Sequence, residues 1–174
     1  HSVLLMQETL LNWKIDGQLK VPVFDKSLRN GLGDRSHWRE EHPDLLILEG
    51  WFLGVKPVSN NFEDDTLITP SLTSHESSYR LNIQKNLNEY LDIWNLIDNI
   101  WQLKPIKFEY MNIWKSKQEN DMFRKKGTAL KDKQLDNFLR MLNVSIPNKC
   151  FEQINPDTLL IINQERKLIE VGLN

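Results

Sequence analysis

The sequence predicts an α/β fold in which an open parallel sheet is flanked by helices. Segments with apolar residues at helical spacing alternate along the chain with short apolar runs that are typical of strands. The run from Leu45 to Leu48 is continuous and bounded by turn residues, which is the pattern of a strand buried on both faces. A chain of 174 residues with 40% hydrophobic residues can bury one sizeable core, so residues 1–174 are predicted to form a single domain.

Local patterns predict the elements along the chain. Ser2 can cap a helix, and Pro22 between alternating apolar residues indicates a strand near a sheet edge. The expected elements are a helix over 3–14, a strand over 19–23, a loop over 23–35, the central strand over 45–48, a surface excursion over 55–79, a long amphipathic helix over 81–97, helices over 106–125 and 132–142, and two strands within 158–171. Residues 100–103 fit either a continued helix or a short strand.

Composition argues against several classes of partner. The net charge of -2, from 22 basic and 24 acidic side chains, gives no reason to expect a nucleic acid or an acidic membrane surface. No apolar run approaches the roughly 20 residues that span a bilayer. The single cysteine, Cys150, cannot form an internal disulfide, so a soluble protein of the cytoplasm is the default expectation.

Glu49 ends the predicted central strand. Ligands of open parallel sheets bind beyond the carboxyl ends of the strands, where an acid can hold Mg²⁺ directly or through water. The same spacing also fits a glutamate that caps a helix or pairs with an arginine, and spacing alone favours this ordinary interpretation.

Asp25 follows the predicted edge strand and is close in sequence to the cations Lys26, Arg29 and Arg35. An acid flanked by cations can accept a hydrogen bond from a substrate hydroxyl while the cations bind an anionic group. Composition alone favours a solvated turn.

A basic stretch, WKSKQENDMFRKKG, lies in the predicted helix over 106–125. Its cations could close over phosphate groups, although such a run is usually a solvated helical face. They are Lys115, Lys117, Arg124, Lys125 and Lys126.

These motifs together resemble a known family. PVFDKSLRNGLGDR, DLLILEGWFLG, NLNEYLDIW, IWKSKQE, MFRKKG and DKQLDNFLRML, in this order, closely resemble the C-terminal part of the P-loop D-glycerate 3-kinase-like proteins, which belong to the uridine kinase and pantothenate kinase superfamily. The resemblance implies a three-layer P-loop NTPase-type parallel sheet flanked by helices, here lacking its first strands. It also implies transfer of the γ-phosphoryl group of ATP to D-glycerate with Mg²⁺, and it favours a strand at 100–103.

The resemblance assigns roles to individual residues. It places Asp25, Lys26, Ser27 and Arg35 in a substrate loop, Glu49 with Gly50 at the end of the Walker B strand as the Mg²⁺ ligand, and Trp114, Lys115, Glu119 and Arg124 on a lid within the helical region 106–142. Lysine replaces the usual arginine after Trp114, and Lys117 or Arg124 could compensate for this change.

Two catalytic parts of the family have no match in residues 1–174. No stretch ends in the GK[ST] sequence that cradles the phosphates of ATP, and the acidic D-D-F-Y segment is also missing. We therefore expect no turnover by this chain alone. The alternatives are a small-molecule binding module without catalysis and a structural remnant of a kinase. Loss of the first strands would also leave a sheet edge through which the chain could self-associate.

Overall fold

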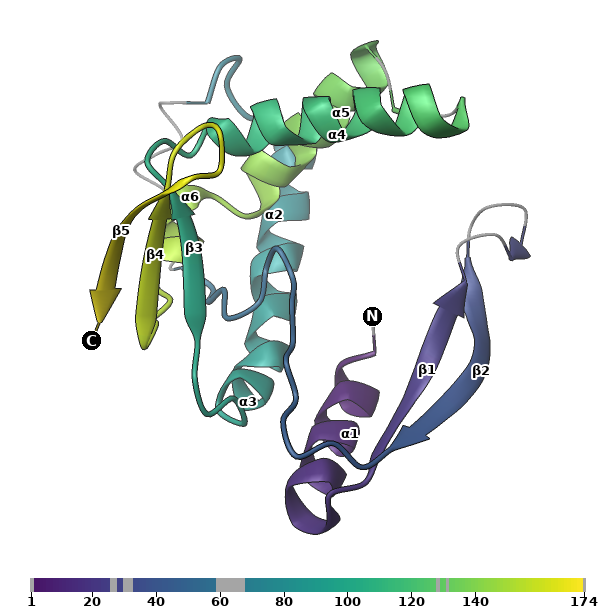
Figure 1. Ribbon diagram of the computed structural model, residues 1–174. Helices are drawn as coiled ribbons and strands as arrows, with labels where there is room; N and C mark the ends of the chain where they lie inside the picture. Colours follow the sequence, from purple (N-terminus) through teal and green to yellow (C-terminus); the bar gives the residue numbers. More distant parts are fainter. Residues whose placement is uncertain are drawn as a thin grey trace. The chain divides into compact units, whose positions relative to one another are not determined.

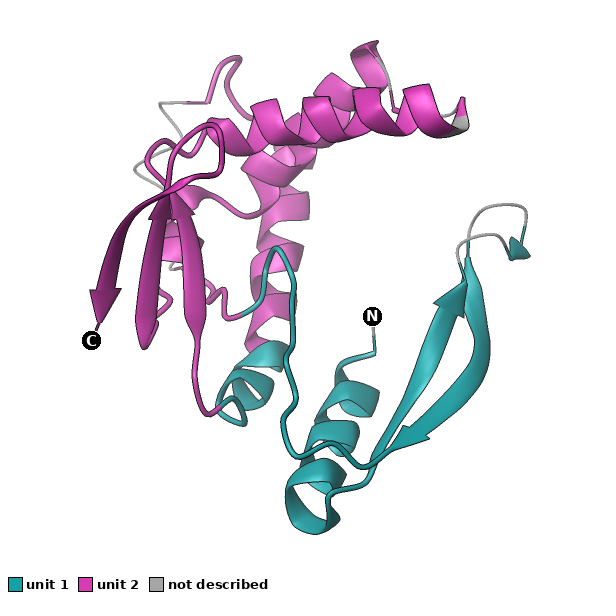
Figure 2. Ribbon diagram, viewed as in Figure 1, with its two compact units in different colours: residues 1–53, 89–97 teal, residues 54–88, 98–174 magenta. Residues whose placement is uncertain are grey.

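The computed structural model describes residues 2–25, 28–29, 33–58, 68–127, 129–130 and 132–173. The chain divides into two compact units, each with its own sheet (Figure 2). Unit 1 comprises residues 1–53 and 89–97, and unit 2 comprises residues 54–88 and 98–174. Within the part of the chain that is described, no helix is long and apolar enough to cross a membrane.

Unit 1 contains helix α1 (Val3–Asp16) and an antiparallel hairpin of strands β1 (Leu19–Asp25) and β2 (Asp34–Glu41). The Ser2 side chain caps the start of α1, and Gly17 ends the helix in the left-handed conformation. The predicted first helix and first strand are therefore confirmed.

The sequence did not predict strand β2, because almost all of its residues are polar and exposed. Backbone pairing with β1 holds it, and the side chain of Lys20 forms an ion pair with Glu40 directly opposite. The loop predicted over 23–35 was wrong at both ends, because β1 continues to Asp25 and β2 begins at Asp34.

The central strand predicted over 45–48 is not present. These residues are all described, and they run without regular secondary structure after β2 (Figure 1). Leu46 and Leu48 pack against the core cluster of unit 1, whereas Leu45 and Ile47 are 74% and 79% exposed. This alternation is typical of a strand, but a strand also needs a hydrogen-bonded neighbour, and none is provided by the described residues.

The core of unit 1 joins segments that are far apart in the sequence. Leu10 of α1 packs with Ile93 and Trp94 of the short helix α3 (Leu91–Trp94), which follows the 3₁₀ turn η3 (Asn88–Tyr90). The Trp13 indole N–H also donates to the carbonyl of Pro43, at 2.8 Å, and so ties the segment after β2 to α1.

Unit 2 contains a three-stranded sheet of order β3-β4-β5 (Figure 1). Strands β3 (Trp101–Pro105) and β4 (Thr158–Ile162) are parallel, which confirms the strand favoured at 100–103. Strand β5 (Leu168–Leu173) is antiparallel to β4. The sheet is therefore mixed and not wholly parallel, because the five residues between β4 and β5 are too few for a parallel crossover.

Three helices form the connection from β3 to β4. They are α4 (Tyr110–Lys126), α5 (Asp132–Ser145) and α6 (Asn148–Glu152). Two of them match the predicted helices, and Gly127 ends α4 in the left-handed conformation as expected for a C-cap. The Gln102 side chain donates to the Phe151 carbonyl at 3.1 Å, so α6 lies against one face of the sheet.

Helix α2 (Ser74–Leu87) begins seven residues before the predicted start and ends well before the predicted end. Its first turn has a capping box, in which the Thr73 hydroxyl accepts from the Glu76 amide and Glu76 accepts from the Thr73 amide. Residues 59–67 of the predicted excursion lie outside the described residues.

The buried face of α2 is mostly polar, with Leu87 as its buried apolar residue. Glu76, Arg80 and Gln84 follow one another at a spacing of four and so lie on one side of the helix. Arg140 of α5 donates to both Glu76 oxygens, at 2.6 and 3.0 Å. Arg80 and Gln84 donate to the backbone carbonyls of the two residues that end α5. This polar stripe fixes α5 against α2.

The polar stripe predicts how unit 2 responds to acid. Hydrogen bonds, first from Arg140 and then from the Thr73 backbone, lower the pKa of Glu76 from its ordinary value of 4.5 to about 2. A lowered pKa in the folded state means that this carboxylate stabilises the fold above about pH 4.5, and that the contribution is lost as the pH falls towards 2. We expect the melting temperature, followed by circular dichroism, to fall over this window.

Glu76→Gln should melt lower than the wild type at pH 7 and should lose less stability below pH 4.5. The matched control is Glu170→Gln on the exposed edge of β5, which should keep the wild-type pH profile. Equal pH profiles for Glu76→Gln and the wild type would contradict the assignment.

Candidate functional site

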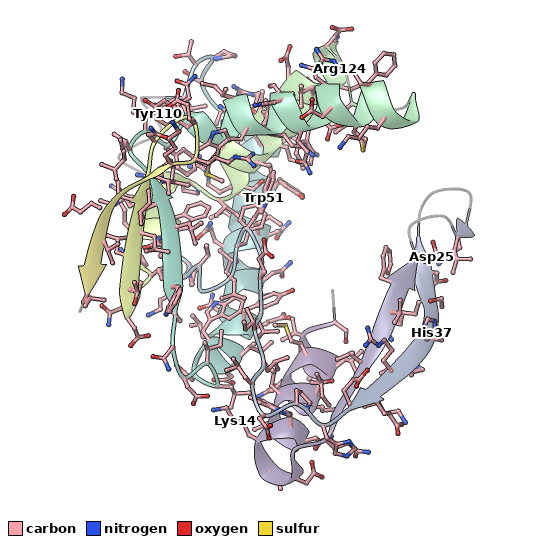
Figure 3. The ribbon with its side chains drawn as sticks, in the orientation of Figure 1. Lys14, Asp25, His37, Trp51, Tyr110 and Arg124 are labelled. Carbon is pink, nitrogen blue, oxygen red and sulfur yellow. The ribbon has the colours of Figure 1, made fainter. Side chains whose placement is uncertain are left out.

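The loop end of the β1–β2 hairpin contains the residues predicted to form a substrate loop. Asp25 and Asp34 are partners across the hairpin, and Figure 3 shows Asp25 at its loop end. Arg29 forms an ion pair with Asp34 at 3.6 Å, and the exposed Arg35 donates its backbone N–H to the Asp34 carboxylate at 2.8 Å. Two acids and two arginines thus surround the end of the hairpin. The predicted site residues Lys26 and Ser27 lie outside the described residues.

Gly33 gives the hairpin loop its backbone path. Its φ is +80°, in the left-handed region that favours glycine, and its N–H donates to the Leu28 carbonyl at 2.9 Å. A Cβ at this position would lie 2.4 Å from the ring of Phe24. Glycine therefore allows both the backbone turn and the close approach of the ring.

Glu49 lies on the irregular segment after β2 and is exposed. Magnesium is usually held by one or two carboxylates together with waters and phosphates, so a single exposed glutamate fits the protein's share of such a site. The described residues contain no group of three or more His, Cys, Asp and Glu side chains that could hold a metal ion. Any further ligands would have to come from the nucleotide, from water or from another part of the protein.

Lys115 is turned towards the interior of unit 2. Its ammonium group forms an ion pair with Glu119 at 2.5 Å and lies 5.2 Å from the centre of the Phe138 ring on α5. The two side chains of the ion pair are only 14% and 4% exposed. The hydrogen bond from Lys115, opposed in part by burial and helped by the Leu130 amide, lowers the pKa of Glu119. These contacts favour a structural role for Lys115 on α4.

Lys117 and Arg124 lie on a different face of α4 and line an open pocket of about 560 Å³. Figure 3 shows the Arg124 side chain projecting from α4. The other described lining residues are Asn112, Ile113, Ser116, Asn120 and Asp121. Asp121 and Arg124 are 4.0 Å apart. Two cations with amide and hydroxyl groups can bind an anion such as a phosphate.

Sequence reasoning missed the uncharged part of this pocket. Asn112, Ser116, Asn120 and Arg124 follow one another at intervals of four, which places them on one side of a helix. A search for polar as well as apolar helical periodicity would have found the row. Two further residues that proved to contact α4, Gln164 and Arg166, lie in the β4–β5 turn and had no recognisable motif.

The predicted site residues fall in both units. Asp25, Arg35 and Glu49 belong to unit 1, whereas Lys115, Lys117 and Arg124 belong to unit 2. Within unit 1, the hairpin loop and the segment with Glu49 are separate elements.

No family model matches the chain. The sequence is 25% identical over 166 residues to uncharacterized kinase mug58 of Schizosaccharomyces pombe, an alignment that covers 87% of this chain and 58% of that protein. It is 29% identical over 158 residues to probable ATP-dependent kinase TDA10 of Saccharomyces cerevisiae, covering 80% of this chain and 50% of that protein. The solved structure of D-glycerate 3-kinase from Cryptococcus neoformans var. grubii superposes with a TM-score of 0.83 at 25% identity, covering 100% of this chain and 67% of that one.

The resemblance to D-glycerate 3-kinase-like proteins is confirmed. The superposition extends over the whole chain, so the predicted α/β fold of this kinase type is confirmed as well. The chain spans about half the length of the curated relatives it matches.

The hairpin loop of this glycerate-kinase-like fold offers a test of the role of Gly33. Replacing a glycine in the left-handed region by alanine costs roughly 1–2 kcal/mol. Gly17→Ala, with a φ of +76° and no atom within 4 Å of the added Cβ, should show that cost alone in chemical denaturation. Gly33→Ala should in addition displace the ring of Phe24, which we expect to see as shifted ring resonances in NMR spectra. An unmoved Phe24 ring would contradict this account.

Proposed function

We propose that this chain is part of an ATP-dependent kinase that phosphorylates a small hydroxy acid, and that this acid is D-glycerate. The observation that carries the proposal is the superposition of the entire chain on a D-glycerate 3-kinase. The name of a second relative, an ATP-dependent kinase, supports ATP as the phosphoryl donor. We also propose the cytoplasm as the location of the protein, on the composition alone.

The hairpin loop would bind the substrate. A hydroxy acid has a carboxylate, which exposed arginines such as Arg35 can bind, and a hydroxyl group, whose proton the carboxylate of Asp25 can accept in a hydrogen bond. Lys26 and Ser27, by the same resemblance, would complete this loop. Recognition of both ends of the substrate would orient its hydroxyl for transfer.

Other residues would bind the nucleotide. Lys117 and Arg124 would bind phosphate oxygens from the pocket on α4, and Lys115 would hold the helix in shape from its inner side. Glu49 would provide one carboxylate for Mg²⁺, which when bound neutralises charge on the phosphate oxygens. This division gives the chain the substrate loop, the acid and the lid.

Residues 1–174 contain no GK[ST] stretch to cradle the phosphates of ATP. Oriented donors at the transferring phosphate provide several kcal/mol of transition-state stabilisation in comparable sites. We therefore propose that the chain binds substrate but does not turn it over by itself. A module that only binds a small molecule, or a purely structural remnant, is the alternative.

Isothermal titration calorimetry with D-glycerate separates these functions. We expect saturable binding by the wild type and at least tenfold weaker binding by Asp25→Ala and by Arg35→Ala. Asp44→Ala, which removes an exposed acid from the same unit, should bind like the wild type. Formation of phosphoglycerate from ATP by the chain alone would contradict the lack of turnover, and absence of any D-glycerate binding would leave only the structural alternative.

We also propose that the chain self-associates through the exposed apolar face of the unit 2 sheet. Residues paired in register share a face, so Trp101 lies with Leu173, and Leu103 lies with Val171, on the face opposite to Gln102 and α6. All four apolar side chains are more than half exposed. Exposed apolar faces and unpaired edges of this kind promote association between chains.

Light scattering tests the association directly. The molar mass of the wild type should be that of a dimer or a larger species. The double variant Leu103→Lys and Val171→Lys should have a molar mass closer to that of the monomer. The control pair Lys104→Ala and Glu170→Ala lies on the opposite face and should leave the association unchanged. A wild type that stays monomeric up to high concentration would refute the proposal.

A further inference from the structure

We infer that Trp114 and Arg166 are positioning residues, and that the β4–β5 turn clamps α4 so that Lys117 and Arg124 face the pocket. The inference rests on the proposed function of that pocket as a phosphate-binding surface. It assigns a role to the β4–β5 turn, which has none in the proposed function.

Helix capping does little to fix the rotation of α4 about its own axis. Its N-cap residue, Glu109, makes no side-chain hydrogen bond to the first turn. Near the other end, Met122 is an exposed large apolar side chain. Side-chain contacts along the length of α4 therefore contribute to its rotation about its own axis.

The first such contact is with the β4–β5 turn. The indole N–H of Trp114 donates to the Gln164 carbonyl at 2.6 Å. The guanidinium carbon of Arg166 lies 5.1 Å from the centre of the Trp114 ring, within the range of a cation–π interaction. Two neighbouring residues of one turn thus hold a single side chain from its edge and its face.

The turn is itself rigid enough to act as a support. Asn163 and Lys167 are joined by a backbone hydrogen bond and by one from the Lys167 amide to the Asn163 side chain, at 3.0 and 2.9 Å. The Arg166 amide donates to the Asn163 carbonyl at 2.9 Å. Arg166 adopts a φ of 61°, a left-handed conformation that costs a residue other than glycine energy. An arginine kept at such a position is consistent with a function for its side chain.

The second contact lies on another side of α4. Successive residues of an α-helix are rotated by about 100° around its axis, so Trp114, Lys115 and Lys117 point in three different directions. Lys115 and Glu119 face Phe138 and the Leu130 amide. With one side held by α5 and another by the β4–β5 turn, the remaining side, with Lys117 and Arg124, is directed into the pocket.

The test compares two variants in the same turn. Arg166→Gly removes the guanidinium and suits the left-handed backbone, so the turn should stay folded. Lys167→Ala removes a neighbouring positive charge and leaves the backbone hydrogen bonds of the turn intact. We expect Arg166→Gly, but not Lys167→Ala, to raise hydrogen exchange of the α4 amides severalfold and to weaken ATP binding about tenfold in calorimetry.

Trp114→Phe provides an independent measure. It keeps an aromatic ring but loses the N–H that donates to Gln164, so it should also raise α4 exchange. Trp114→Phe also identifies the part of the tryptophan fluorescence that Trp114 contributes. Arg166→Gly, made with Trp114 in place, should shift that part of the emission. The effects of the two substitutions on α4 exchange should be less than additive, because both remove parts of one clamp.

The outcomes separate the clamp from the function of the pocket. Equal α4 exchange in Arg166→Gly and Lys167→Ala would overturn the clamp, whatever happens to ATP binding. Faster α4 exchange with unchanged ATP affinity would overturn the positioning role. Failure of the wild type to bind ATP would overturn the proposed function of the pocket, while the exchange data would still decide whether the clamp exists.

Discussion

The bidentate ion pair between Glu76 and Arg140 is the interaction on which the arrangement of unit 2 depends. Glu76 belongs to the capping box that starts α2, and Arg140 also donates to the Pro70 carbonyl at 3.1 Å. One pair therefore joins the entry to α2, its first turn and the middle of α5. Both side chains are about three-quarters buried, so loss of either partner would leave a poorly solvated charge.

The effect of this pair reaches the candidate site through a series of supports. Further along α2, the buried Gln84 donates to the Ser145 carbonyl and contacts the Cys150 thiol, whose pKa is raised by burial. Helix α5 is thereby fixed along its length. It presents Phe138 to Lys115, and Lys115 with Glu119 fixes one side of α4. The pocket on α4 thus depends on contacts that are remote from any ligand.

The sequence predicted the elements whose burial is apolar and missed those whose burial or pairing is polar. The apolar run of β4 and the apolar positions of α5 identified these two elements correctly, whereas only the family resemblance favoured the strand at β3. The first half of α2 was missed because its buried stripe consists of charged and amide side chains, and β2 was missed because its pairing is through the backbone. Residues 45–48 have the pattern of a buried strand, but whether such a run is paired depends on a neighbour that its own residues do not specify.

The sequence located the charged residues of the candidate site, but it did not show which of them can bind a ligand. The basic stretch from Lys115 to Lys126 has five cations, yet the charge of Lys115 is neutralised by its ion pair with Glu119, and the hydrogen bond from Lys115 lowers the pKa of that carboxylate. Lys117 faces the pocket without such a partner among the described residues, and Arg124 is offset only by Asp121 at 4.0 Å. A phosphate that approached the pocket side of α4 would therefore meet the positive charges of Lys117 and Arg124. The rotational setting of the helix, more than the number of its lysines and arginines, decides what it can bind.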